Sequence, residues 1–288
     1  MAPFARADDG VIPAGRNNGK AGAGMRYAGK VAIVTGGGDG IGRETSLRLA
    51  AEGAAVLVFD ISAVAAEATV AAIVAAGGRA ARCVGSVTVE ADVAAAVAMA
   101  RETLGGLDVL VNNVAFTNRP VLEGIAPADW DREFDVTLKG AWLFARAVLP
   151  RLVGQGRGAI VNIGSVNGLM YFGNPAYSAA KAGLLSLTRS LAVEYGPKGV
   201  RANMVSPGTI QTNAPSWTAR LKRDPKVFEK LARWYPVGRV GRPADIAAAV
   251  AFLAADEAGF VNGANLVVDG GLTAGMPVMA DELLAERT

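Results

Sequence analysis

Short, almost wholly apolar segments alternate with longer segments of helical character along most of this chain. The short segments are typical of parallel strands that are buried on both faces. We predict strands at 30–35, 55–60, 79–84, 107–112, 158–163, 200–205 and 265–269. We predict helices from about 41 and at 62–76, 89–104, 128–153, 175–195, 213–235 and 243–255. This alternation predicts an α/β fold, a doubly wound parallel sheet of about seven strands with helices on both faces.

The pattern continues without a linker or a repeat, so residues 27–288 are predicted to form one domain. Residues 1–26 are rich in small and polar residues and are expected to be a flexible N-terminal extension. The helical region 213–235 carries several aromatic residues, Trp217 among them, and is expected to form a lid over a substrate site.

Composition narrows the classes of function. The net charge of +3 arises within the first thirty residues, which argues against a nucleic-acid-binding domain. The longest apolar run, Ile246–Ala255, is too short to span a bilayer, so we expect no membrane association. The single cysteine, Cys83, excludes an internal disulfide and a cysteine-cluster metal site, and no metal is expected. We therefore expect a cytoplasmic protein that acts on a small molecule.

A glycine-rich turn follows the first predicted strand, at Gly36–Gly42, and leads into a helix. Glycines allow close backbone approach, and a helix N-terminus offers free N–H groups to a pyrophosphate. The second strand ends in Asp60, where a carboxylate can accept both hydroxyls of an adenosine ribose. A helix N-cap is the alternative role for Asp60. Together these features predict a dinucleotide site.

The stretch Ser165–Lys181 carries the candidate chemistry. Tyr177 and Lys181 lie one helical turn apart, so they share a face. The cation favours the phenolate and lowers the pKa of the tyrosine from about 10. A serine hydroxyl nearby can hold a carbonyl oxygen. Since the chain contains no histidine, proton chemistry near neutral pH needs such a pair.

These motifs stand in a fixed order: Thr35-Gly36 with Gly40-Ile41-Gly42, Asn112-Asn113, Ser165, Tyr177-x-x-x-Lys181, Pro207-Gly208 and Val268-Asp269-Gly270-Gly271. In them, over roughly residues 27–273, the chain resembles the short-chain dehydrogenase/reductase family with its Rossmann-like fold. The resemblance implies that Tyr177 is the general acid/base, that Lys181 holds the nicotinamide ribose, and that Ser165 positions the substrate oxygen. It implies these cofactor-binding residues: Gly36, Asp39, Gly40, Ile41, Gly42, Asp60, Ile61, Ser86, Val87, Asn113, Tyr177, Lys181, Pro207, Gly208, Ile210 and Thr212.

The chain departs from the family pattern at position 137. Thr137 replaces an asparagine that helps to hold a water behind the lysine, so we expect the proton relay to be impaired or rerouted.

Asn112 is equally compatible with a structural role and with cofactor contact. Asp39 and Asp60 would repel the extra phosphate of NADP, which predicts NAD as the cofactor.

The expected reaction is hydride transfer between NAD(H) and a secondary alcohol or ketone. Substrate contacts are expected from Asn167, Tyr171 and Trp217. A 3-oxoacyl-carrier-protein reductase and a non-catalytic dinucleotide sensor remain as alternatives. From the family's usual contacts through the helices at 128–153 and 175–195, we expect a homotetramer.

Overall fold

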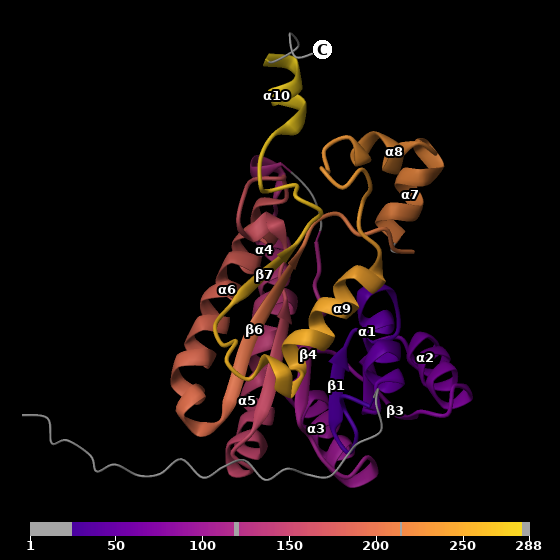
Figure 1. The fold of residues 1–288 in the computed structure, drawn as a ribbon, viewed down its shortest axis with the longest axis vertical. Coiled ribbons are helices and arrows are strands. Elements are labelled where there is room, and N and C mark those ends of the chain that lie inside the picture. The colour runs from indigo at the N-terminus through magenta and orange to yellow at the C-terminus, as the bar shows by residue number, and fades with distance from the viewer. Residues whose placement is uncertain (1–24, 118–120, 214, 284–288) are drawn as a thin grey trace, which may run out of the picture.

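The computed structural model describes residues 25–117, 121–213 and 215–283. Nearly all of the predicted extension at 1–26 lies outside these residues. Within them, the strands pair in parallel in the order β3-β2-β1-β4-β5-β6-β7 (Figure 1). The strands are β1 (Val31–Thr35), β2 (Ala55–Asp60), β3 (Arg79–Val84), β4 (Val109–Asn112), β5 (Gly158–Ile163), β6 (Val200–Pro207) and β7 (Asn265–Val268). The predicted doubly wound parallel sheet is confirmed.

Helices cover both faces of the sheet. The α-helices are α1 (Gly40–Ala51), α2 (Ala63–Ala75), α3 (Glu90–Thr103), α4 (Pro127–Phe134), α5 (Gly140–Gly154), α6 (Pro175–Tyr195), α7 (Pro215–Arg223), α8 (Val227–Ala232), α9 (Pro243–Ala254) and α10 (Pro277–Leu283). Single 3-10 turns are η1 (Leu122–Gly124), η3 (Val166–Gly168), η4 (Gly196–Lys198) and η5 (Asp256–Ala258). Helix α10, which the sequence pattern did not predict, extends away from the sheet (Figure 1).

Two hydrophobic clusters, one on each face, form the core. On β1, Val31 and Ile33 belong to the cluster under α3, α5 and α6, whereas Ala32 and Val34 belong to the cluster under α1, α2 and α9. Successive side chains of a strand point to opposite faces, so an all-apolar strand supplies both clusters at once. This is why the strands show no polar alternation in the sequence.

The predicted helix at 128–153 is helical throughout but is not one α-helix. A π-helical turn, η2 (Asp135–Lys139), separates α4 from α5. Thr137 lies at its centre and is fully buried. π-Helical turns accommodate an extra residue in a helix and are frequent at functional sites.

Residues before β1 pack against the far end of the chain. Tyr27 is fully buried and its hydroxyl donates a hydrogen bond to the carbonyl of Ala251 in α9. Burial is the main cause that raises the pKa of the Tyr27 phenol. Among the described residues, no helix combines the length and the apolar character needed to cross a membrane.

Candidate active site

The order of the strands indicates where a ligand-binding site should lie. Strand order reverses between β1 and β4, and in such sheets ligands bind outside the carboxyl ends of the strands at this point. A cavity of about 1370 Å³ opens there. Its lining comes from the loops after β1 to β6 and from the segment that holds α7 and α8.

The turn between β1 and α1 brings backbone close to the cavity. Gly36 and Gly40 have φ angles of +62° and +53°, which side-chain-bearing residues rarely adopt. A Cβ on Gly42 would lie 2.0 Å from the carbonyl oxygen of Gly36, so only glycine allows α1 to start so near the turn. Gly42 does not line the cavity. The start of α1 beside the turn depends on Gly42, and its predicted cofactor contact stays a prediction.

Asp60, at the end of the neighbouring strand β2, stabilises the glycine turn. Its Oδ2 accepts a hydrogen bond from the Gly38 amide at 2.9 Å, and its Oδ1 accepts one from the Ser62 amide at 2.9 Å. These bonds fix the carboxylate at the end of β2. Asp39 caps α1 by accepting from the Gly40 amide at 2.7 Å. Both carboxylates and Ile61 line this end of the cavity.

The two asparagines at the end of β4, Asn112 and Asn113, have different roles. The Asn113 side-chain amide donates to the carbonyls of Thr35 and Gly36, at 3.1 and 3.3 Å, and so holds the glycine turn. Asn112 is buried and donates to Asn162 at 2.9 Å and to the Ala141 carbonyl at 3.3 Å. Asn113 lines the cavity and Asn112 does not, which favours the structural interpretation of Asn112.

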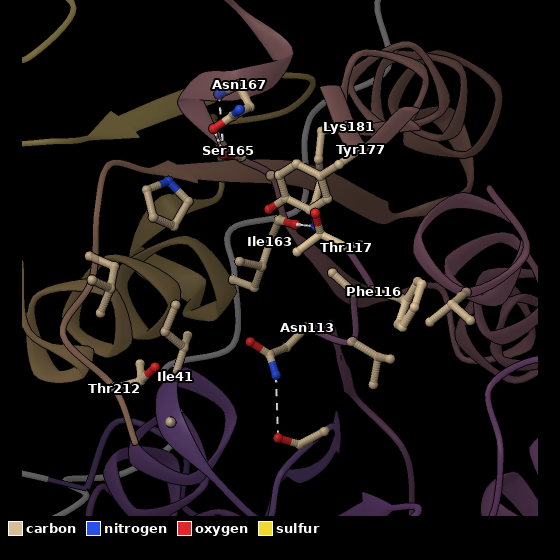
Figure 2. A pocket seen from close by; sticks show the side chains of 18 of the residues that line it. Ile41, Asn113, Phe116, Thr117, Ile163, Ser165, Asn167, Tyr177, Lys181 and Thr212 are labelled. Atoms are coloured by element: carbon tan, nitrogen blue, oxygen red, sulfur yellow. Dashed lines mark hydrogen bonds between the residues drawn. The ribbon is translucent and has the colours of Figure 1, made fainter. Parts of the chain in front are cut away.

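Ser165, Tyr177 and Lys181 line the same cavity, and Figure 2 draws them with Asn113, Ile41 and Thr212 around it. Helix α6 carries Tyr177 and Lys181, and the Lys181 ammonium lies 5.6 Å from the centre of the Tyr177 ring. Lys181 is 1% exposed, and its Nζ donates to the Ile163 carbonyl at 2.5 Å. Burial lowers the pKa of Lys181 to about 7 because the charged form is desolvated.

The Ser165 hydroxyl is held by Asn167. It accepts a hydrogen bond from the backbone amide of Asn167 at 3.1 Å and donates one to the side-chain Oδ1 of Asn167 at 3.3 Å. The Asn167 Nδ2 in turn donates to the Gly173 carbonyl at 3.1 Å. Asn167 lines the cavity. Its side-chain amide forms hydrogen bonds within the loop that orients Ser165.

The Thr137 hydroxyl bonds the backbone of Phe116. It accepts from the Phe116 amide at 3.2 Å and donates to the Phe116 carbonyl at 3.4 Å. Its one donor is therefore used on a residue of the loop after β4. These bonds hold a residue of the cavity wall, and the expected effect of Thr137 on the proton relay stays a prediction.

The remaining predicted cofactor residues, Gly36, Gly40, Ile41, Ser86, Val87, Pro207, Gly208, Ile210 and Thr212, all line the cavity. Trp217 also does. Tyr171 does not: it follows η3 in a loop and its side chain is 81% exposed. The position of Tyr171 therefore gives no support to its predicted substrate contact, which stays a prediction.

The sequence did not single out Phe116, Arg132 and Leu231, which also line the cavity. Phe172, Arg220, Trp234 and Tyr235 line it too, the last three from the region 213–235 that was expected to form a lid. Arg132 and Arg220 sit on different helices, far from any motif, and no sequence signal joins them. The Tyr235 hydroxyl accepts from the Thr209 amide at 2.8 Å, which ties the segment after α8 to the loop after β6.

The side chains present fit a nicotinamide dinucleotide. A glycine turn at a helix N-terminus suits a pyrophosphate, a fixed carboxylate at the end of β2 suits a ribose, and a buried ammonium suits a second ribose. The cavity is also large enough for a dinucleotide together with a small substrate.

Comparisons with known proteins agree with this geometry. The model of a family described as enoyl-(acyl carrier protein) reductase matches residues 36–273. The cis-4-hydroxycyclohexanecarboxylate dehydrogenase of Sinomonas cyclohexanicum is 42% identical over 253 residues, 87% of this chain and 99% of that protein. The cyclohexanol dehydrogenase of Acinetobacter sp. (strain SE19) is 38% identical over 254 residues, 86% of this chain and 96% of that protein.

A solved structure extends the likeness to the whole fold. An oxidoreductase from Burkholderia thailandensis, assigned to the short-chain dehydrogenase/reductase family, matches with a TM-score of 0.80 at 43% identity. The match covers 89% of this chain and 97% of that one. Members of this family use nicotinamide cofactors. The chain therefore belongs to the short-chain dehydrogenase/reductase family of oxidoreductases.

Proposed function

We propose that this protein is an NAD-dependent dehydrogenase that interconverts a secondary alcohol and the corresponding ketone. One observation carries the proposal: Ser165, Tyr177 and Lys181 line the same cavity as a glycine turn and a fixed Asp60. The names of two similar proteins, cyclohexanol dehydrogenase and cis-4-hydroxycyclohexanecarboxylate dehydrogenase, describe oxidation of a ring alcohol and support the substrate class.

In the proposed mechanism each side chain acts on the substrate oxygen or on its proton. The Ser165 hydroxyl turns from Asn167 and donates a hydrogen bond to that oxygen. The Tyr177 phenolate accepts the proton of the alcohol hydroxyl, and in the reverse direction the phenol returns it to the ketone oxygen. NAD, when bound, supplies the acceptor for the hydride that leaves the alcohol carbon.

Lys181 serves this proton transfer through its charge. Its ammonium donates to the Ile163 carbonyl, and burial lowers the pKa of Lys181 to about 7. A phenolate on Tyr177 supplies an opposite charge, which favours the ammonium, and the ammonium favours the phenolate in the same way. The pair therefore works as a unit near neutral pH.

The cofactor choice follows from charge at the adenosine end. Asp39 and Asp60 line it, and Asp60 is fixed by the Gly38 and Ser62 amides. The extra phosphate of NADP carries about −2 charge, and each carboxylate at contact distance opposes it by about 2–8 kcal/mol. We propose NAD as the cofactor for this reason.

We also infer that residues 27–288 form a single catalytic domain in which α7 and α8 act as a lid. Trp217 of α7 packs on Phe228 of α8, with ring centres 5.0 Å apart. This aromatic contact supports the view that the two short helices move together.

The test is a panel of secondary alcohols with NAD and NADP, followed by the absorbance of the reduced nicotinamide. We expect oxidation of cyclic or aliphatic secondary alcohols, faster with NAD at equal concentration. Faster turnover of a 3-oxoacyl thioester with NADPH would favour the carrier-protein reductase instead. Cofactor binding without turnover of any alcohol or ketone in the panel would favour a dinucleotide sensor.

A further inference from the structure

Two arginines, Arg132 and Arg220, line the same cavity as Ser165, Tyr177 and Lys181. Arg132 comes from α4 and Arg220 from α7, so the helix before the π-helical turn and the lid each contribute one. None of the ion pairs between described residues includes Arg132 or Arg220. Guanidinium groups that are not paired with a carboxylate keep donors free for a ligand.

Each of these guanidinium groups rests on an aromatic ring of the same cavity. The Arg132 guanidinium lies 4.2 Å from the centre of the Phe116 ring, and that of Arg220 lies 4.8 Å from the centre of the Trp217 ring. Stacking on a ring holds a guanidinium in place and leaves its edge available. Phe116 is itself fixed, because Thr137 bonds both its amide and its carbonyl.

Two carboxylates of the cavity lie near Arg132 in sequence but are not paired with either arginine. Asp131 and Asp135 also line the cavity. Asp135 is paired with Lys139 at 3.2 Å, and none of the ion pairs between described residues includes Asp131. Neither carboxylate therefore occupies the guanidinium groups of Arg132 and Arg220.

We propose that the substrate of this enzyme is a secondary alcohol or ketone that carries an anionic group, a carboxylate or a similar oxyanion, which Arg220 and Arg132 bind. This inference rests on the proposed dehydrogenase function and names its substrate class. Arg220 belongs to the proposed lid, so an anion held there also favours lid closure over the reacting carbon.

The test uses alcohols that differ only in charge: cyclohexanol, cis-4-hydroxycyclohexanecarboxylate and the methyl ester of that acid. Wild-type enzyme is expected to have at least a 10-fold higher kcat/KM for the acid than for cyclohexanol or the ester, because charge-assisted hydrogen bonds contribute roughly 10- to 100-fold. In Arg220→Gln and in Arg132→Gln the ratio of acid to ester is expected to fall about 10-fold, mainly through KM. Arg223→Gln is the matched control, since Arg223 lies on α7 but does not line the cavity.

Binding provides a readout that does not need turnover. Calorimetric titration of the enzyme–NADH complex with cyclohexanecarboxylate should give a lower Kd than with cyclohexanol, and Arg220→Gln should remove the difference while Arg223→Gln keeps it. Tighter or equal binding of the neutral compound overturns the inference. So does a weaker affinity for NADH in Arg220→Gln with unchanged acid selectivity, which would assign Arg220 to the cofactor phosphates.

These outcomes separate the inference from the proposed function. If cyclohexanol and the ester are oxidised well and the acid poorly, the enzyme is a dehydrogenase and the anionic substrate class is wrong. If no alcohol is oxidised but cyclohexanecarboxylate still binds through Arg220, the proposed reaction fails and the anion site stands.

Discussion

Lys181 is the residue whose environment departs most from that of an ordinary surface lysine. It is 1% exposed, donates to the Ile163 carbonyl and lies next to the Tyr177 ring. Burial lowers its pKa from 10.5 to about 7 in the folded protein. Between these two pH values the unfolded chain binds more protons than the folded one, so stability of the ligand-free enzyme rises with pH over this window.

A Lys181→Met variant tests that effect. Raising the pH from 7.5 to 9 should increase the free energy of unfolding of the wild type, relative to the variant, by at most about 2 kcal/mol. Below pH 7 the difference between the two proteins should become constant, because Lys181 is then protonated in both states. Urea unfolding of the cofactor-free proteins at several pH values measures this, and parallel pH profiles would show that the lysine is not buried in solution.

The hydrogen bonds of the Thr137 hydroxyl can be tested by substitution. Thr137→Val keeps the shape of the side chain but removes both hydrogen bonds to Phe116. We expect a loss of about 1–2 kcal/mol in the free energy of unfolding and a higher KM for the alcohol, since Phe116 lines the cavity. Thr137→Ser should restore both values. If valine changes neither quantity, the hydroxyl does not hold the loop.

Single residues differ in how far the sequence alone identifies them. The spacing of Ser165, Tyr177 and Lys181 predicts their convergence, because helical periodicity and strand order fix it. The role of Thr137 does not follow from spacing, since its partner Phe116 lies twenty-one positions away on a loop. Loop conformation also determines that Asn167 bonds to Ser165 whereas Tyr171 is exposed to solvent, and the sequence pattern does not reveal that conformation.

At the scale of elements, the junction of β1, α1 and β2 forms one unit. Asn113 holds the glycine turn from β4, and Asp60 accepts from Gly38 inside that turn. The sequence predicts this unit because glycines and a strand-terminal acid leave few other geometries. It does not predict the interruption of the helix at 128–153, where Thr137 bonds the backbone of a residue on another segment.

The Asp60→Asn variant tests cofactor selection by this unit. Removing the charge while keeping the size should lower the ratio of kcat/KM with NAD to kcat/KM with NADP by roughly 10-fold or more. Asp39→Asn should have a smaller effect, because the Asp39 side chain is exposed and its charge is better screened. A wild-type enzyme that prefers NADP would contradict the assignment before any variant is made.

At the scale of the molecule, two cores on the faces of one sheet leave some apolar side chains outside. Trp142 on α5 and Val193 on α6 are 40% and 76% exposed. Exposed apolar residues on long helices are compatible with contacts between copies of the chain. We propose a homotetramer that uses these helices. The fold itself was predictable from the strand and helix alternation, whereas the assembly depends on surface detail that the pattern does not contain.

Light scattering coupled to size exclusion measures the assembly. We expect the mass of four chains for the wild type. Trp142→Arg should shift the mass toward dimers or monomers, because a charge would be buried at the contact. A monomeric wild type would contradict the proposal.

The central claim is that Tyr177 moves the proton of a secondary alcohol in an enzyme that uses NAD. Its most direct test compares the wild type with Tyr177→Phe and with the control Tyr195→Phe, which changes a tyrosine of α6 that does not line the cavity. We expect Tyr177→Phe to lower the rate of nicotinamide reduction by at least about 100-fold while the Kd for NADH stays within about 2-fold, and we expect the control to keep both values. Turnover that survives in Tyr177→Phe at the wild-type rate would contradict it.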